Sequence, residues 1–125
     1  MSVLNENAVT LLSTTTVAFN ANADTTLYTV PAGHRCVLSH AIVVAGADAG
    51  STDLSIGADG AETDFINAWD TDNLDAAYDA IRLQPIPADP PPKMKSYAAG
   101  TVIQMNVANQ AGGATNTVYL FGHLY

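Results

Sequence analysis

The sequence predicts an all-β protein, an antiparallel β-sandwich of the jelly-roll kind with at most one short helical turn. About eight short segments either alternate apolar with polar residues or are rich in β-branched residues. Clusters of Gly, Pro, Asn and Asp separate them about every ten residues, a spacing typical of sandwiches. An immunoglobulin-like sandwich is the nearest alternative, but the Cys-Trp-Cys framework of that fold is absent.

Size and charge indicate a single domain that belongs to an assembly. The chain has 125 residues, of which 48% are hydrophobic and only 13% are charged, and its formal net charge is -8. We expect one sandwich domain over residues 8–125, preceded by an N-terminal arm of residues 1–7. The low share of charged residues is expected if much of the surface is buried between subunits, although a Thr-rich secreted β-protein would also explain it.

The same composition excludes several classes of partner. Four basic residues are too few to form a phosphate-binding patch, so we expect no nucleic-acid partner. No apolar run approaches membrane-spanning length and no signal peptide is recognisable, which predicts synthesis in a cytoplasm and no membrane partner. The single cysteine, Cys36, is expected to be a buried small hydrophobe.

The stretch from Thr25 to Ala45 is the part around which the rest is arranged. It predicts a strand at Leu27–Val30, a turn at Pro31–Gly33 and a long strand from Arg35 to Ala45, the two strands forming a hairpin. In the long strand, alternation puts Cys36, Leu38, Ile42 and Val44 on one side and Val37, Ala41, Val43 and Ala45 on the other. Both sides are apolar, so the second must be covered by another part of the chain or by another subunit.

The flanking segments continue the strand pattern. Residues 8–20 alternate with Val17 and Phe19 facing inward. Residues 51–57 predict a short strand, the Asp59–Gly60 pair a hairpin turn, and residues 63–69 a strand with Phe65 and Trp69 on one face.

The segment from Asp70 to Pro92 is the least regular. Leu74, Ala77, Tyr78 and Ile81 have helical spacing, so we predict a helical turn over Asn73–Tyr78 and then a strand from Ala80. Five of the six prolines follow between residues 85 and 92, which excludes a central strand and predicts a stiff connection suited to a fixed surface contact. Lys93 and Lys95 come directly after it.

The C-terminal third predicts two more strands, at residues 101–108 and 117–125. In the second, Val118, Leu120 and Leu124 face one way and Tyr119, Phe121, His123 and Tyr125 the other. This strand is therefore also apolar on both sides. We expect Val37, Ala41, Val43, Tyr119, Phe121, His123 and Tyr125 to form an oligomer interface.

No set of residues carries a catalytic signature. Phosphate loops, nucleophile elbows, HExxH and CxxC motifs are all absent, and carboxylate pairs such as Glu62 with Asp64, or Asp64 with Asp70, arise by chance among twelve acids. We predict no enzyme activity and no cofactor. His34, His40 and His123 lack the spacing of a metal site and are interpreted as packed or interfacial residues. If His40 is buried between subunits, assembly becomes sensitive to acid.

A cation loop is the weaker interpretation of Asp70, Asp72 and Asp75. Their oxygen ligands alternate as in calcium loops, but the sixth-position glycine and the bidentate glutamate of an EF-hand are missing. We favour acids that cap the following turn.

Two segments carry a resemblance to a known class of protein. TTLYTVPAGHRCVLSHAIVVAGAD resembles the strand-turn-strand of small structural proteins of tailed bacteriophages, and YAAGTVIQMNVANQAGGATNTVYLFGHLY is similar to their C-terminal end. The resemblance covers about half of the chain and implies a virion protein made in the host cytoplasm. It implies a capsid decoration (cement) protein, a homotrimer on the outer surface of the head that binds the major capsid protein.

Besides the decoration protein that the resemblance implies, the residues leave open a glycan- or receptor-binding module and a cellular β-sandwich of unrelated role. As a decoration protein, the chain would meet the capsid through its arm residues Ser2, Val3, Leu4, Asn5 and Asn7. As a glycan- or receptor-binding module of a tail fibre, it would use Phe65, Trp69, Asp70 and Asp72, although we favour Trp69 as a core residue.

Overall fold

The computed structural model describes residues 9–86, 88–91, 93–110 and 113–125, so the predicted N-terminal arm lies outside the described residues. Within these ranges the chain forms nine strands and no helix. The strands are β1 (Thr10–Ala18), β2 (Ala23–Thr29), β3 (Cys36–Val44), β4 (Asp53–Ala58), β5 (Ala61–Asp70), β6 (Ala80–Leu83), β7 (Ser96–Tyr97), β8 (Val102–Ala108) and β9 (Thr115–Leu124).

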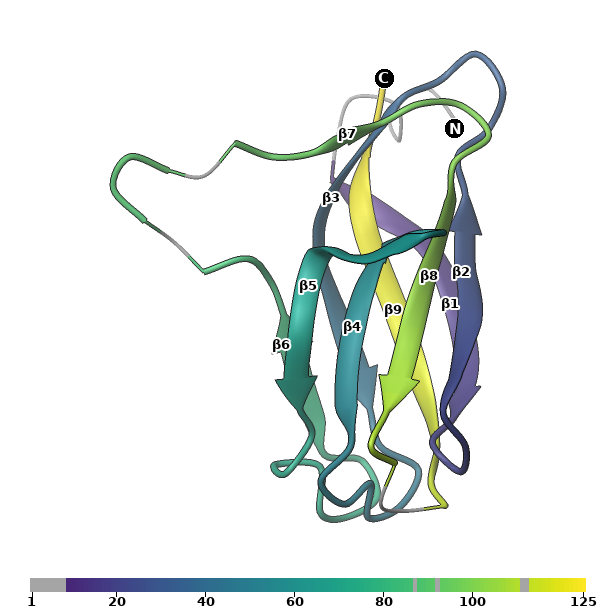
Figure 1. Ribbon diagram of the computed structural model, residues 1–125, viewed down its shortest axis with the longest axis vertical. Coiled ribbons are helices and arrows are strands. Elements are labelled where there is room, and N and C mark those ends of the chain that lie inside the picture. Colours follow the sequence, from purple (N-terminus) through teal and green to yellow (C-terminus); the bar gives the residue numbers. More distant parts are fainter. Residues whose placement is uncertain (1–8, 87, 92, 111–112) are drawn as a thin grey trace.

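Two antiparallel sheets pack face to face, as Figure 1 shows. The first has the order β1-β9-β3-β6, with the short β7 also paired to β3, and the second has the order β2-β8-β4-β5. The antiparallel pairs are nested along the chain: β4 pairs with β5, β3 with β6, β2 with β8 and β1 with β9. This is the pairing of one long hairpin whose strands are divided between two sheets. This arrangement is a jelly roll, and the predicted all-β sandwich is confirmed.

The core lies between the sheets and is built from the inward side chains of almost every strand. Its largest fully buried members are Phe19, Leu54, Ile56, Ile66, Leu74, Leu83, Ile103, Met105, Leu120, Val17, Val30 and Val43. The predicted inward positions Val17, Phe19, Leu54 and Ile56 are all among them.

The predicted hairpin between Leu27–Val30 and the following long strand is wrong. Strand β2 pairs with β8, whereas β3 pairs with β9, β6 and β7 in the other sheet. The turn at Pro31–Gly33 carries the chain from one sheet to the other, and Gly33 has a φ of 78° there, which favours glycine. A strand-turn-strand pattern does not tell whether its two strands pair with each other or cross between sheets.

A β-bulge in β3 overturns the predicted faces of that strand. The register shifts between Leu38 and His40, which leaves Ser39 as the extra residue and reverses the alternation beyond it. Ala41 and Val43 therefore face the core and are fully buried. Their predicted place on the outer face is wrong, and His40 and Ile42 lie there instead.

The predicted helical turn at Asn73–Tyr78 is also wrong. The segment makes two separate turns, one closed by Leu74 N–H donating to Thr71 O (2.8 Å) and one by Asp79 N–H donating to Ala76 O (3.2 Å). Leu74 is fully buried and closes one end of the core, whereas Tyr78 is 89% exposed with a φ of 73°. The helical spacing was a coincidence, because these two residues point in different directions.

Strand β5 departs from its predicted alternation as well. Its register against β4 shifts twice, and Ala68 has a φ of 44°. As a result Ile66 enters the core, Phe65 packs only partly against it, and Trp69 is 39% exposed. The interpretation of Trp69 as a core residue is wrong.

The close approach of β4 and β5 generates a stability prediction. A Cβ on Gly57 would overlap the Ala61 carbonyl and lie 2.8 Å from the Asp64 backbone N, so Gly57→Ala forces the hairpin apart. We expect a loss of about 1–3 kcal/mol in the free energy of unfolding, measured by chemical denaturation. Gly113→Ala is the control, because nothing lies within 4 Å of its added Cβ. Equal stability of the two variants would contradict the packing described here.

Candidate interaction surfaces

The middle of the outer face of the β1-β9-β3-β6 sheet is apolar and aromatic, while the edge strands add the polar Thr14 opposite Tyr119 and Arg82 opposite Ile42. Cross-strand register places Leu11, Phe121 and His40 in one row and Tyr119 beside Ile42 in the next. We name this surface the apolar sheet face, and it comprises Leu11, Val37, His40, Ile42, Val44, Tyr119, Phe121 and His123. All are half-buried except Leu11, which is exposed. Because they occupy neighbouring positions on the central strands β3 and β9 and on the edge strand β1, they form a continuous surface.

The outer face of the other sheet is different in character. There Asp24 lies opposite Asn106, and Thr26 lies opposite Gln104. The Asn106 amide donates to the Asp24 carboxylate at 2.6 Å, so this face is polar. The contrast singles out the apolar sheet face as the surface in need of a partner.

Most of the predicted interface residues lie on or beside the apolar sheet face. Val37, Tyr119, Phe121 and His123 are on it, and the exposed Tyr125 stacks on His123 with 5.6 Å between ring centroids. Ala41 and Val43, as described above, are in the core. His40 and Ile42 take their place, and the sequence pattern missed them because the bulge at Ser39 carries no distinctive residue type.

His40 is the titratable centre of this face. Its ring stacks on Phe121 with 4.6 Å between centroids and 10° between planes, and its Nδ1 is 2.9 Å from Ser39 Oγ. Partial burial lowers the pKa of His40, and the Arg82 guanidinium on the neighbouring strand β6 lowers it further.

The proline-rich connection between β6 and β7 forms a second surface feature. We name residues 84–86, 88–91 and 93–95 the proline-rich arm. They extend away from the sandwich (Figure 1), and all of them are exposed. Two large apolar side chains are included, Ile86 at 69% and Met94 at 57% exposure. Prolines limit the conformations of this arm and favour an extended chain.

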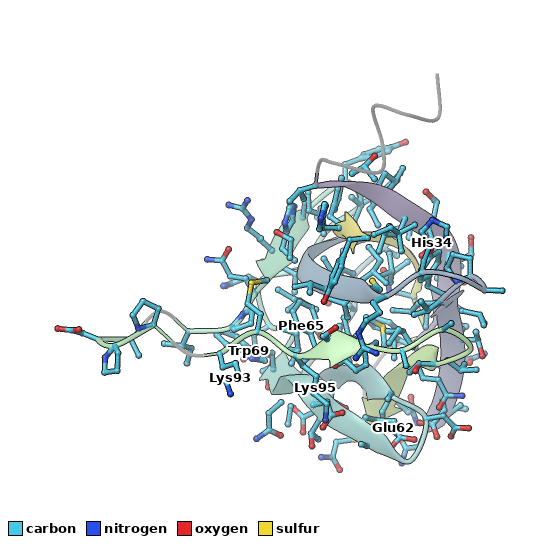
Figure 2. All side chains as sticks on the ribbon, turned by 90° about the horizontal axis from the view of Figure 1, so that it is seen from above. His34, Glu62, Phe65, Trp69, Lys93 and Lys95 are labelled. Atoms are coloured by element: carbon cyan, nitrogen blue, oxygen red, sulfur yellow. The ribbon has the colours of Figure 1, made fainter. Side chains whose placement is uncertain are left out.

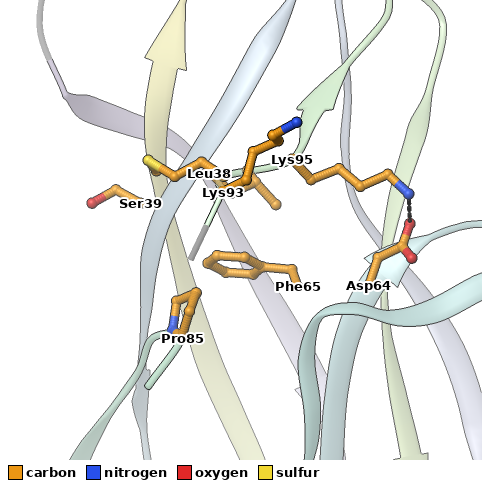
Figure 3. A pocket seen from close by; sticks show the side chains of 8 residues that line it. Leu38, Ser39, Asp64, Phe65, Pro85, Lys93 and Lys95 are labelled. Atoms are coloured by element: carbon orange, nitrogen blue, oxygen red, sulfur yellow. Dashed lines mark ion pairs between the residues drawn. The ribbon is translucent and has the colours of Figure 1, made fainter. Parts of the chain in front are cut away.

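A pocket of about 300 Å³ lies where the proline-rich arm meets the sandwich. Figure 3 shows the Phe65 ring between Pro85 and Lys93, with the Lys95 side chain reaching to Asp64. Lys95 Nζ is 3.0 Å from Asp64 Oδ2, an ion pair that ties the returning end of the arm to β5. We name this site the Phe65 pocket.

Phe65 and Pro85 also line a second, more open groove of about 570 Å³ along β5. Trp69 and Asp70 line it together with Asn67 and Ile86. The proposed glycan-binding group is therefore partly assembled, since Phe65, Trp69 and Asp70 share this groove. Figure 2 shows Phe65 and Trp69 near the root of the arm.

The loop acids are engaged with their own backbone and neighbours. The Asp70 carboxylate accepts a hydrogen bond from Asp72 N–H at 2.7 Å, Ser51 Oγ donates to Asp72, and Asp75 interacts with Asp79, which raises the pKa of Asp75. Asp75 thus turns toward another carboxylate rather than toward Asp70 and Asp72. Among the described residues, no group of three or more His, Cys, Asp or Glu side chains could hold a metal ion.

The remaining candidates from the sequence have structural surroundings. Glu62 accepts a hydrogen bond from Gly60 N–H in the β4–β5 turn, and His34 Nδ1 is 3.2 Å from Ala32 O in its own turn. Cys36 is fully buried, and burial raises the pKa of its thiol to about 11. In the described part of the chain, no helix is long and apolar enough to cross a membrane.

The position of His40 generates a pH prediction. Because its pKa is lowered in the folded protein, the neutral ring is favoured, and stability is complete above the ordinary pKa near 6.5 and falls as the pH drops below it. We expect the melting temperature to fall between pH 7.5 and pH 5. The fall should be smaller in His40→Gln, which does not titrate. His123→Gln is the control for the other histidine on this face, and an equal fall in all three proteins would contradict the role of His40.

Comparisons with known proteins agree with the fold. No protein-family model matches the sequence, and no curated protein matches it. Two solved structures match nearly the whole chain. The first is an acid-stable capsid structure of Helicobacter pylori bacteriophage KHP30, with a TM-score of 0.61, 14% identity and coverage of 94% of this chain and 88% of that chain. The second is the capsid asymmetric unit of cyanophage Pam1, with a TM-score of 0.56, 15% identity and coverage of 94% and 86%. The chain therefore shares its fold with chains of two bacteriophage capsid structures.

Proposed function

We propose that this protein is a bacteriophage virion protein of the decoration type, which binds the outside of the head as a homotrimer and stabilises it without catalysing a reaction. The observation that carries the proposal is the match of nearly the entire chain to chains of two phage capsid structures. Coverage is high in both directions, so those chains are close to this one in length.

The apolar sheet face supports self-association. It offers Phe121, Tyr119 and Ile42 on one side of a protein whose other sheet face is polar. Burying apolar area of this kind contributes about 25 cal/mol per Å², so three copies that cover these faces gain stability without salt bridges. This matches the low share of charged residues, since a surface that is buried needs few of them.

Stabilisation of the head follows from linkage. A protein that binds only the assembled shell shifts the equilibrium toward that shell, in proportion to the logarithm of its concentration over its dissociation constant. A trimer multiplies weak contacts, because the second and third contacts form at high effective concentration. The contact of Ser2, Val3, Leu4, Asn5 and Asn7 with the major capsid protein stays a prediction.

The glycan-binding alternative rests on the exposure of Trp69. An exposed tryptophan beside Phe65 and Asp70 is a typical sugar platform, and the groove volume of about 570 Å³ lies within the usual range of small-molecule sites. A glycan array separates the two functions, because a decoration protein gives no specific sugar signal.

Binding to heads is the direct test. The purified protein is mixed with heads of the phage that encodes it, assembled without this chain, and sedimented. We expect saturable co-sedimentation and a higher melting temperature of the decorated heads. Glycan binding without co-sedimentation would replace the proposal by the alternative.

Self-association is tested by Ile42→Lys, which puts a charge in the middle of the apolar sheet face. We expect the trimer to dissociate at least about tenfold more readily in sedimentation equilibrium, because the lysine would have to be desolvated at the interface. Thr26→Lys is the matched control on the polar face of the other sheet. If Thr26→Lys weakens the trimer and Ile42→Lys does not, the assignment of the two faces is wrong.

A further inference from the structure

The Phe65 pocket combines positive charge with an apolar surface. It holds Lys93 and Lys95, two of only four basic residues in a chain of net charge -8, beside the apolar surface of Phe65, Pro85 and Met94. Asp64 engages Lys95 at 3.0 Å, while Lys93 forms no ion pair within the described ranges. The pocket is therefore suited to a small apolar segment that carries one carboxylate.

The tip of the proline-rich arm has this chemistry. Ala88, Asp89, Pro90 and Pro91 are exposed, and Asp89 is the only charged residue among them. Proline-rich segments lose little conformational entropy on binding and pack well on aromatic rings. The arm presents them away from its own sandwich, as Figure 2 shows.

The tip is directed away from the pocket of its own chain. Pro85 and Lys93, where the arm leaves and returns, are themselves walls of the pocket. The tip between them projects outward from this point in both Figure 1 and Figure 2. A second copy of the chain, by contrast, can present its tip to this pocket from outside.

We propose that the arm tip of one copy docks in the Phe65 pocket of the next, with Asp89 paired to Lys93 and the prolines against Phe65. The contact joins two different surfaces, so its repetition closes a ring when the rotation between copies allows it, as a trimer requires. This inference rests on the self-association of the proposed function and names a second contact besides the apolar sheet face.

Charge reversal tests the pairing. Lys93→Glu and Asp89→Lys each place like charges together, so each should raise the dissociation constant of the oligomer about tenfold at low salt. The double variant should recover the wild-type value, and a mixture of the two single variants should associate more tightly than either alone. Asp59→Lys, at the exposed β4–β5 turn, is the control with the same change in charge as Asp89→Lys. The double variant could regain the wild-type dissociation constant while the mixture of single variants does not. That result would show that the arm binds the pocket of its own chain, and it would overturn the proposal.

Disulfide cross-linking tests whether the arm tip of one copy lies in the pocket of another, without a measurement of binding affinity. Ser39 lines the pocket and Ala88 lies at the tip, so Ser39→Cys and Ala88→Cys proteins are mixed and oxidised under native conditions. Cys36 is buried with a pKa raised to about 11 and stays unreactive. We expect a disulfide-linked dimer that combines the two variants and little product from either one alone. A yield in the mixture no higher than in the separate variants would overturn the proposal.

The outcomes separate this inference from the proposed function. A trimer that survives both reversals but dissociates in Ile42→Lys leaves the apolar sheet face as interface and overturns the arm contact. Arm variants that associate normally but no longer sediment with heads show that the arm meets the shell instead, which also overturns it. A wild-type protein that stays monomeric at all concentrations overturns both the arm contact and the homotrimer, while its binding to heads can still be measured.

Discussion

Strand β3 lies at the centre of its sheet and is apolar on both faces. Its backbone is hydrogen-bonded to β9 along one edge and to β6 and β7 along the other. Cys36, Leu38, Ala41 and Val43 fill the core beneath it, while Val37, His40, Ile42 and Val44 lie above it. Because a strand cannot expose that many apolar side chains without a cost in hydration, the second face of β3 constrains what the molecule does with its surface.

The bulge at Ser39 determines which residues of β3 face the core and which face outward. Without it, His40 would point into the core, where its polar ring would need a buried partner. With it, His40 lies outside, stacked on Phe121, and the small Ala41 packs against the opposite sheet. One extra residue thus converts a possible buried polar group into part of an interaction surface.

The two candidate surfaces differ in kind. The apolar sheet face extends over three strands, since every residue on it belongs to β1, β3 or β9. The Phe65 pocket is local and holds Lys93 and Lys95, whereas the tip of the proline-rich arm carries the acidic Asp89. The returning end of the arm is anchored to the body by the ion pair of Lys95 with Asp64. A broad apolar contact supplies affinity, and a small charged contact supplies orientation.

The sequence by itself determined the fold class, most strand positions and the two-sided character of β3 and β9, because alternation and turn chemistry are local properties of the chain. Only the tertiary structure decided which strands share a sheet, so the expected hairpin at Pro31–Gly33 became a crossing between sheets. It also decided the faces of β3 and β5 and the exposure of Trp69, since bulges reverse alternation without a distinctive residue type. The Phe65 pocket joins β3, β5 and the proline-rich arm, which are far apart in the chain, and such a meeting follows from strand order rather than from any local pattern.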